Sequence, residues 1–139
     1  MKLIDFIVCD DVRQEVGNKP SLMGVYTNLV LAASPDKKPP VWPFPLRLGF
    51  FIRCQIEADE VKSDFFRIEF ILNGEIFSHV EGTASIPDDT NMFSIVVVNN
   101  AFQIQGTGAI HFRIIFKKSG ELIQEIEPDY FLYVEVAPD

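Results

Sequence analysis

Residues 46–57 alternate between apolar and mostly polar side chains, and this alternation constrains the fold more than any other feature of the chain. The apolar set is Leu46, Leu48, Phe50, Ile52, Cys54 and Ile56. Side chains of a β-strand point to opposite faces with a period of two, so the segment is predicted to be one strand with an apolar and a polar face. The same period recurs along the chain, which indicates a layered β protein.

Further segments with alternating apolar residues are separated by turn signals. They are residues 66–72, 76–86, 110–116 and 130–136, and the apolar stretch 92–104 is expected to be a central strand or to contain a bulge near its asparagines. A helical period is not sustained anywhere, and residues 11–16 are the only candidate for a helical turn. About eight short strands with little or no helix predict an all-β fold: one antiparallel β-sandwich domain of immunoglobulin-like architecture over residues 1–139, or a flattened barrel.

Two glycines are predicted to close β-hairpins. At Asn73-Gly74 a two-residue turn would place charge opposite core residues, whereas a three-residue loop with Gly74 in the left-handed region pairs apolar residues with one another. The same reasoning applies to Gly120. The predicted pairs are Phe70 with Ile76, Phe66 with Val80, Phe116 with Leu122 and Phe112 with Ile126.

Residues 34–45 contain five prolines and are predicted to form an extended connection between the two sheets. Proline lacks the amide proton that a central strand needs. Within the segment, Trp42 and Phe44 are candidates for contact with a partner, because a stiff backbone presents their rings at low entropic cost. The alternative is that both rings fold over a sheet edge and shield it.

The charge and the hydropathy of the chain disfavour several classes of partner. The formal net charge is −8 at pH 7, whereas nucleic-acid binding depends on Lys and Arg that neutralise phosphates. Nucleic acid and anionic membrane surfaces are therefore not expected as partners. The apolar N-terminal stretch is interrupted by Asp5, and no stretch approaches the ~18 apolar residues of a membrane-spanning helix. The protein is expected to be soluble and cytoplasmic.

The residues that could carry chemistry are few. Cys9 and Cys54 are predicted to be buried free thiols, with a disulfide between adjacent strands as the alternative. The histidines, His79 and His111, fall on the polar faces of their strands, and with Arg113 they would form a polar patch if those strands are neighbours. Without a nucleophile motif beside them, an enzyme that uses His79 or His111 is the weakest functional prediction, and no cofactor is expected.

Paired acidic residues offer a second chemistry. The candidate ligands are Asp10, Asp11, Asp88 and Asp89, since Ca²⁺ prefers carboxylate oxygens and a sandwich can gather loops at one end. The alternative is that these carboxylates are solvated loop tips, because no EF-hand spacing is present. A ligand-binding or calcium-binding sandwich is therefore the second functional prediction.

The leading functional prediction is a non-catalytic module that binds a protein partner or assembles with copies of itself. The candidate contact residues are Trp42, Phe44, Arg47, Phe51 and Arg53. The last three occupy the second face of the strand at 46–57, which is a mixed basic and aromatic surface on an acidic protein. Either this face, the tryptophan segment or a sheet edge would provide the interface.

The N-terminal part of the chain carries one further pattern. The stretch is Cys9-Asp10-Asp11-Val12-Arg13-Gln14-Glu15, followed by Lys19-Pro20-Ser21-Leu22-Met23-Gly24-Val25-Tyr26. It resembles a family of small bacterial proteins known only as a domain of unknown function. The resemblance implies a bacterial or phage-related origin and a β-rich fold, and it assigns no role to any residue.

Overall fold

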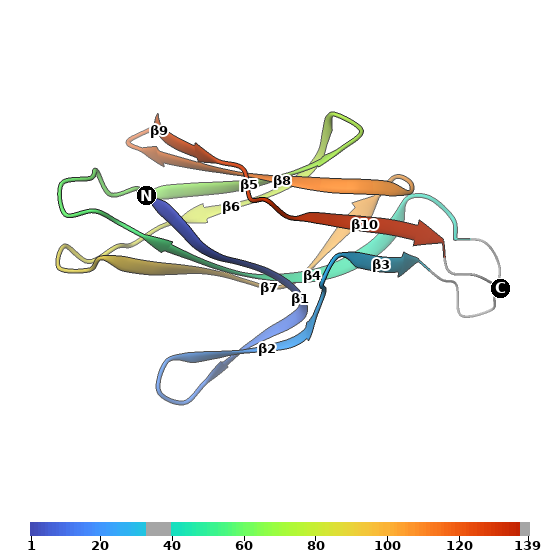
Figure 1. Cartoon of the computed structure of the whole chain (residues 1–139), viewed down its shortest axis with the longest axis horizontal. Helices are drawn as coiled ribbons and strands as arrows, with labels where there is room; N and C mark the ends of the chain where they lie inside the picture. The colour runs from blue at the N-terminus through green and yellow to red at the C-terminus, as the bar shows by residue number, and fades with distance from the viewer. Residues whose placement is uncertain (33–39, 137–139) are drawn as a thin grey trace.

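The computed structural model describes residues 1–32 and 40–136, which form two β-sheets (Figure 1). The strands are β1 (Lys2–Glu15), β2 (Lys19–Val25), β3 (Leu29–Ala32), β4 (Phe44–Gln55), β5 (Phe65–Leu72), β6 (Glu75–Thr83), β7 (Met92–Ile104), β8 (Gly108–Lys118), β9 (Glu121–Ile126) and β10 (Phe131–Val136). Sheet A has the order β2-β1-β4-β7, and sheet B has the order β3-β10-β8-β5-β6, with β9 also paired to β8. In Figure 1, β8 and β10 lie in the upper layer and β4 and β7 in the lower layer.

The predicted β-sandwich is confirmed, with ten strands where about eight were expected. The strands β1-β4-β7 face the strands β10-β8-β5-β6, which is the A-B-E against G-F-C-C′ order of immunoglobulin-type sandwiches. One pairing departs from the antiparallel prediction, because the short β3 runs parallel to β10. The described residues contain no helix, and therefore none that is long and apolar enough to cross a membrane.

The alternation at residues 46–57 is confirmed by burial. All six apolar side chains of that set are at most 8% exposed and face sheet B. The rings of Phe50, Phe70 and Phe112 meet between the sheets, with centroid distances of 5.4 Å from Phe50 to Phe70 and 5.7 Å from Phe50 to Phe112. Aromatic rings at such distances add specific edge and stacking contacts to the burial of their area. These three side chains join β4 of one sheet to β5 and β8 of the other.

The predicted three-residue loop at residues 72–74 is wrong. Asn73 and Gly74 form a two-residue turn, both with positive φ (53° and 79°), and Leu72 pairs directly with Glu75. The register then shifts within the return strand, so that Phe70 faces Ser78 and Ile68 faces Val80. A bulge in β6, beyond the turn, brings Val80 opposite Ile68, and the turn keeps the geometry that suits the strand twist.

The second hairpin, between β8 and β9, has the same combination of turn and bulge. Ser119 and Gly120 have φ values of 51° and 82°, which confirms the left-handed conformation predicted for Gly120. The predicted pairing of Phe116 with Leu122 is wrong, because Lys117 faces Leu122 and Phe116 faces Gln124. A bulge after Leu122 again shifts the register. Both sequences therefore encode a two-residue turn followed by a bulge.

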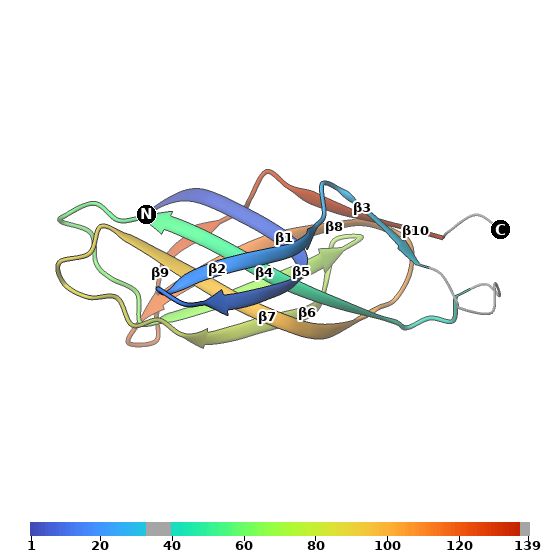
Figure 2. The same cartoon turned by 90° about the horizontal axis from the view of Figure 1, so that it is seen from below.

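Residues 10–25 form a hairpin, here called the arm, that leaves sheet A. The predicted helical turn at 11–16 is wrong, because β1 continues as a strand to Glu15 and pairs there with β2 alone. The apolar stretch from Ser21 onward forms two strands in different sheets, β2 and β3. Seen from below in Figure 2, the arm lies across β4 and β7.

The proline-rich segment links the two sheets, as predicted, since β3 belongs to sheet B and β4 to sheet A. Its residues 34–39 lie outside the described part of the chain. Pro45 falls inside β4, opposite Gln103 of β7. The ladder between β1 and β4 reaches only Gly49, so no β1 residue faces Pro45.

Cys9 and Cys54 are both buried and free, which confirms the prediction for the two thiols. They lie on adjacent strands, but Cys9 faces Gly49 and Cys54 faces Leu3. The offset of five residues along β4 separates them by roughly 17 Å, far beyond the reach of a disulfide. Burial raises the pKa of the Cys54 thiol to about 11, and burial likewise raises the pKa of Cys9.

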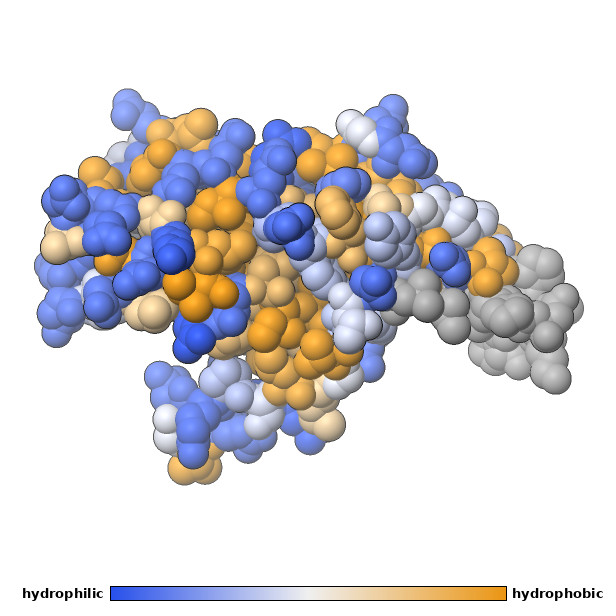
Figure 3. Space-filling view, viewed as in Figure 1, coloured by the Kyte–Doolittle hydropathy of each residue, from blue (hydrophilic) through white to orange (hydrophobic). Residues whose placement is uncertain are grey.

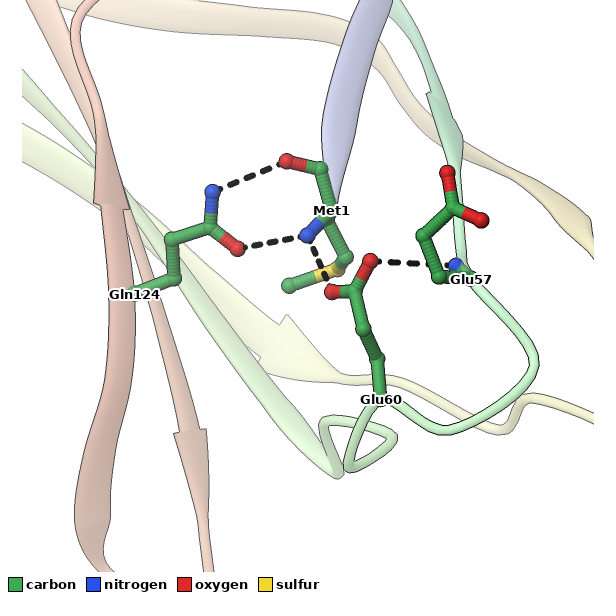
Figure 4. A network of polar contacts seen from close by, with 4 residues as sticks. All are labelled: Met1, Glu57, Glu60 and Gln124. Atoms are coloured by element: carbon green, nitrogen blue, oxygen red, sulfur yellow. Dashed lines mark hydrogen bonds and ion pairs between the residues drawn. The ribbon is translucent and has the colours of Figure 1, made fainter.

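The first residue of the chain contacts both layers (Figure 4). The amino group of Met1 binds Glu60 and donates to Gln124 Oε1 at 2.8 Å, while Gln124 Nε2 donates to the Met1 carbonyl at 2.9 Å. The second oxygen of Glu60 accepts from the amide of Glu57 at 3.0 Å. The hydrogen bond from the ammonium group holds the pKa of Glu60 below its ordinary value. These contacts fasten the start of β1 to β9.

Candidate functional site

The strand β7 lies at the edge of sheet A, and its outer side is unpaired within the described residues. The expectation of a central strand is wrong, whereas the expected bulge is confirmed: the register with β4 shifts between Leu48 and Phe50, opposite Val97 and Asn100. A continuous apolar run usually indicates a strand buried on both sides, which is why the sequence favoured a central position. Here the run forms an open edge.

The hydrogen bonding of β4 shows which groups of β7 are free. The amide of Ile56 donates to the carbonyl of Asn91 at 2.8 Å. In an antiparallel ladder, residues that exchange hydrogen bonds alternate with residues whose backbone groups point away from the partner. The backbone groups of Phe93 and Ile95 therefore point toward β4, and those of Met92, Ser94 and Val96 point toward the open edge.

Apart from one bulge, this edge lacks the protection that edge strands usually have. Natural edges are guarded by charged residues, by proline, by bulges or by short length. The other edge strands follow that rule: β2 contains Lys19 and Pro20, β6 contains Glu75 and Glu81, β9 contains Glu121 and Glu125, and β3 has four residues. In contrast, β7 spans 13 residues without a charged side chain or a proline. Its bulge near Asn99 leaves residues 92–97 regular.

A hollow of about 190 Å³ lies beside the β7 edge on the side of the core. Its lining combines the end of β6 and the following residues with the start of β7: Phe66, Thr83, Ala84, Ser85, Ile86, Phe93, Ser94, Ile95 and Val96. The aromatic rings of Phe66 and Phe93 line it together with polar groups of Thr83, Ser85 and Ser94, so the hollow is uncharged and of mixed polarity. Its volume is that of one or two side chains, and residues 93–96 of β7 form one of its walls.

A second, larger groove of about 490 Å³ lies on the outer face of the same strand, under the tip of the arm. The arm contributes Gln14, Asn18 and Pro20, and sheet A contributes Phe51, Arg53, Met92, Phe93, Ser94 and Val96. Figure 3 shows a notch between the tip of the arm and the body of the molecule. The edge of β7 thus has a recess on each face, at positions where alternate side chains of a strand point.

Three of the predicted contact residues lie on the outer face of β4, close to this groove. Phe51 and Arg53 line it, while Arg47 is exposed further along the strand, opposite Ala101. The guanidinium of Arg53 binds Asp5 of β1 through Nη2 and Nε at 2.6 and 2.7 Å. Its charge is therefore partly neutralised by the neighbouring strand.

The other two predicted contact residues lie elsewhere. Trp42 and Phe44 are half-buried and pack against the core, with their ring centroids 6.3 Å apart. Phe44 faces Ile104 at the far end of β7. Both rings thus contact the core of the domain, and their contact with a partner stays a prediction.

The predicted calcium ligands are not brought together. Asp10 accepts a hydrogen bond from the hydroxyl of Tyr26 at 2.5 Å at the base of the arm, and its carboxylate also covers Gly24. Burial, followed by the hydrogen bond to Asp10, raises the pKa of Tyr26. Asp11 accepts from the amide of Val12 at 2.9 Å. These contacts give the two aspartates of the arm a structural role.

The second acidic pair lies in the loop between β6 and β7. Asp88 and Asp89 border a shallow hollow of about 350 Å³ that also contains Lys62. Across residues 1–32 and 40–136, no group of three or more His, Cys, Asp or Glu side chains is placed to hold a metal ion. The calcium-binding function stays a prediction that a calcium titration can test.

The two histidines lie on the outer face of sheet B, with β5 between their strands. His79 faces Glu69, which is only 6% exposed and has each carboxylate oxygen 3.4 Å from the Nε of an arginine, Arg67 or Arg113. His111 instead packs against Phe131, at a centroid distance of 4.4 Å. The two imidazoles therefore belong to different rows of the sheet.

His111 borders a hollow of about 670 Å³, which also contains Glu127 and Asp129 from the connection between β9 and β10. No serine, threonine or cysteine lines this hollow, so a histidine-activated nucleophile of the usual kind is not assembled there. Catalysis by His79 or His111 stays a prediction.

Comparison with known proteins identifies a family. A family model described as "Family of unknown function (DUF6941)" matches residues 4–127. No curated protein and no solved structure matches the chain.

Proposed function

The chain belongs to the family of unknown function DUF6941, and we propose that it is a non-catalytic interaction domain that takes up an extended strand of a protein along the open edge of β7. One observation carries the proposal: β7 offers the backbone groups of Met92, Ser94 and Val96 on an edge without charge or proline. Such an edge is a template for an added strand, whose main-chain hydrogen bonds supply affinity.

The topology supports the same position. In immunoglobulin-type sandwiches a fourth strand, D, continues the A-B-E sheet beyond E. Here the chain passes from β6 to β7 through residues 84–91 without forming a strand, so this segment makes no ladder with β7, although its first residues lie across the 190 Å³ hollow from residues 93–96. A strand from a partner would complete the sheet at that place.

The recesses beside β7 indicate what the added strand contains. Side chains that point toward the core would enter the 190 Å³ hollow, whose lining carries no charge and includes Phe93 and Ile95. Side chains on the other face would lie over Met92 and Val96, beside the 490 Å³ groove. Pockets for alternate side chains are the usual source of specificity in strand addition. The preferred segment is therefore uncharged, with apolar residues at alternate positions.

The test uses a synthetic seven-residue peptide of alternating Val or Ile and Thr or Ser, with blocked ends, added to the ¹⁵N-labelled protein. We expect the amide resonances of Met92, Ser94 and Val96 to shift, with smaller changes at the edges of β2 and β6. Ser94→Pro should weaken binding at least tenfold, because it removes a donor from the open edge. Ser94→Ala, which keeps the amide, should bind as the wild type does.

A second peptide with Lys in place of the central Val tests the uncharged 190 Å³ hollow, and it should bind more weakly. If the first peptide at millimolar concentration leaves β7 of the dilute, monomeric protein unchanged, or if Ser94→Pro binds as tightly as Ser94→Ala, the β7 edge is not a peptide-binding site.

A further inference from the structure

We infer that the strand that fills the β7 edge is β7 of a second copy of this chain, so that two copies join their A sheets around a two-fold axis at Ser94. This inference rests on the proposed function and names its partner. A two-fold axis makes two identical edge strands antiparallel automatically, and each copy then contributes the same surface. Such a dimer requires β7 to be complementary to itself.

The free backbone groups of β7 fit this symmetry. Met92, Ser94 and Val96 follow one another at intervals of two, with Ser94 in the middle. Antiparallel pairing about Ser94 places Ser94 opposite its own copy and Met92 opposite Val96 of the second copy. Each of these three pairs exchanges two hydrogen bonds, which gives about six across the contact. Pairing about Phe93 or Ile95 would put a residue whose backbone groups bind β4 at the axis and would align only two outward-pointing pairs, which gives about four hydrogen bonds.

The side chains are complementary in the same register. On the core side, Phe93 faces Ile95 of the second copy, and aromatic side chains pair well with β-branched ones. The hollow of about 190 Å³ beside both residues provides space for this contact. On the outer side, Met92, which is 36% exposed, faces Val96, while the two Ser94 hydroxyls face each other.

Charge favours this edge over the others for self-association. The chain carries −8, so two copies repel each other through their net charge, and acidic groups within the contact would add to this repulsion. Residues 92–104 contain none. The edge of β9, in contrast, would place Glu121 opposite Glu125 if it paired with itself about Ile123. Like charges directly opposite each other destabilise a strand pair.

The first test measures mass against concentration by sedimentation velocity. The wild type should change from 15.8 kDa at low concentration towards twice that mass. Ser94→Lys, which places two ammonium groups opposite each other at the axis, and Ser94→Pro should stay monomeric at concentrations at least tenfold above the wild-type midpoint. Ser94→Ala and His79→Lys, on the edge of β6, should associate as the wild type does. Circular dichroism and thermal melting establish that each variant is folded.

The second test uses the register of the two β7 strands, in which Ser94 lies opposite its own copy. In a hydrogen-bonded antiparallel pair the Cα atoms are about 5.5 Å apart, which suits a disulfide. Ser94→Cys should therefore form a covalent dimer under mild oxidation. Val98→Cys is exposed in the same strand but would lie roughly 26 Å from its copy, eight residues away along the ladder, and it should not cross-link.

The outcomes separate the inference from the proposed function. If the wild type stays monomeric at millimolar concentration while the peptide still binds to β7, the second copy is not the partner and the strand-binding function stands. If the protein dimerises equally with Ser94→Pro, or if Val98→Cys cross-links as fast as Ser94→Cys, the dimer uses another surface and the inference is wrong. If neither peptide nor second copy binds at β7, both are wrong.

Discussion

Val12 of the arm packs directly on Gly49 in the middle of β4. A Cβ at Gly49 would lie 3.1 Å from Cγ2 of Val12 and 3.2 Å from the carbonyl oxygen of Val97, closer than normal packing permits. Val12 is 1% exposed although it lies on the outer face of sheet A. Glycine at this position therefore lets the arm cross the sheet, and the crossing forms the groove beside Phe51 and Met92.

Gly49→Ala should loosen the arm. The added methyl group has to displace either Val12 or the backbone of Val97, and such overpacking costs about 1–3 kcal/mol of the free energy of unfolding. Urea denaturation measures this loss, and hydrogen exchange should accelerate at the amide of Val12. Gly106→Ala is the control, because nothing lies within 4 Å of its added Cβ. Equal stability of the two variants would show that the arm does not depend on close approach.

Ser119→Asn should stabilise the protein. Ser119 has a φ of 51°, a conformation that asparagine tolerates better than serine, and Asn-Gly is the preferred pair for this turn. The amide of Ser119 donates to the Asp64 carboxylate at 3.1 Å, a contact that the substitution keeps. We expect a gain of about 0.5–1 kcal/mol in urea denaturation. A loss of stability would mean that the serine hydroxyl has a role in the turn.

The stability of the fold should fall at high pH because of Cys54. Burial raises the pKa of its thiol to about 11, so the folded chain holds this proton more tightly than the unfolded chain does. The corresponding stability is complete below the unfolded pKa of about 8.5 and is lost as the pH rises through about 11. Between pH 8 and 11 the free energy of unfolding should fall less steeply in Cys54→Ala than in the wild type. An equal decrease of the free energy of unfolding in both proteins would show that Cys54 is not responsible for this pH dependence.

At low pH the free energy of unfolding should depend on the protonation of Glu60. Its pKa is lowered by the Met1 ammonium group, so the contact stabilises the fold above the unfolded pKa of about 4.3 and is lost as the pH falls through the lower folded value. Glu60→Gln should reduce the loss of stability between pH 5 and 3, by no more than about 1 kcal/mol because the pair is partly exposed. Glu57→Gln, which keeps the amide that donates to Glu60, should behave as the wild type does.

The sequence predicted the layers of this fold better than its edges. The alternation of Leu46, Phe50 and Ile52 decides which face of β4 is buried, because the period of a strand is fixed by its backbone. The positions of bulges are not fixed in this way. At Phe77 and Ile123 one extra residue shifts the register, and only packing across the sheet decides where that residue lies.

The candidate site was missed for a similar reason. The sequence alone shows that the strand from Met92 to Ile104 has no charged residue. Whether such a strand is central or at an edge depends on the order of strands, which is a long-range property. Phe51 and Arg53 were identified because they lie on the second face of β4, but their neighbours Met92 and Val96 were not identified as candidates.

Hydrogen exchange at single amides tests the central claim most directly. The amides of Ser94 and Val96 point to the open edge, so in dilute monomer they should exchange far faster than those of Phe93 and Ile95, which point to β4. As concentration rises, Ser94 and Val96 should become protected while amides at the β6 edge stay fast. Unchanged, fast exchange at Ser94 and Val96 at every concentration, with or without the peptide, would contradict a strand-binding edge at β7.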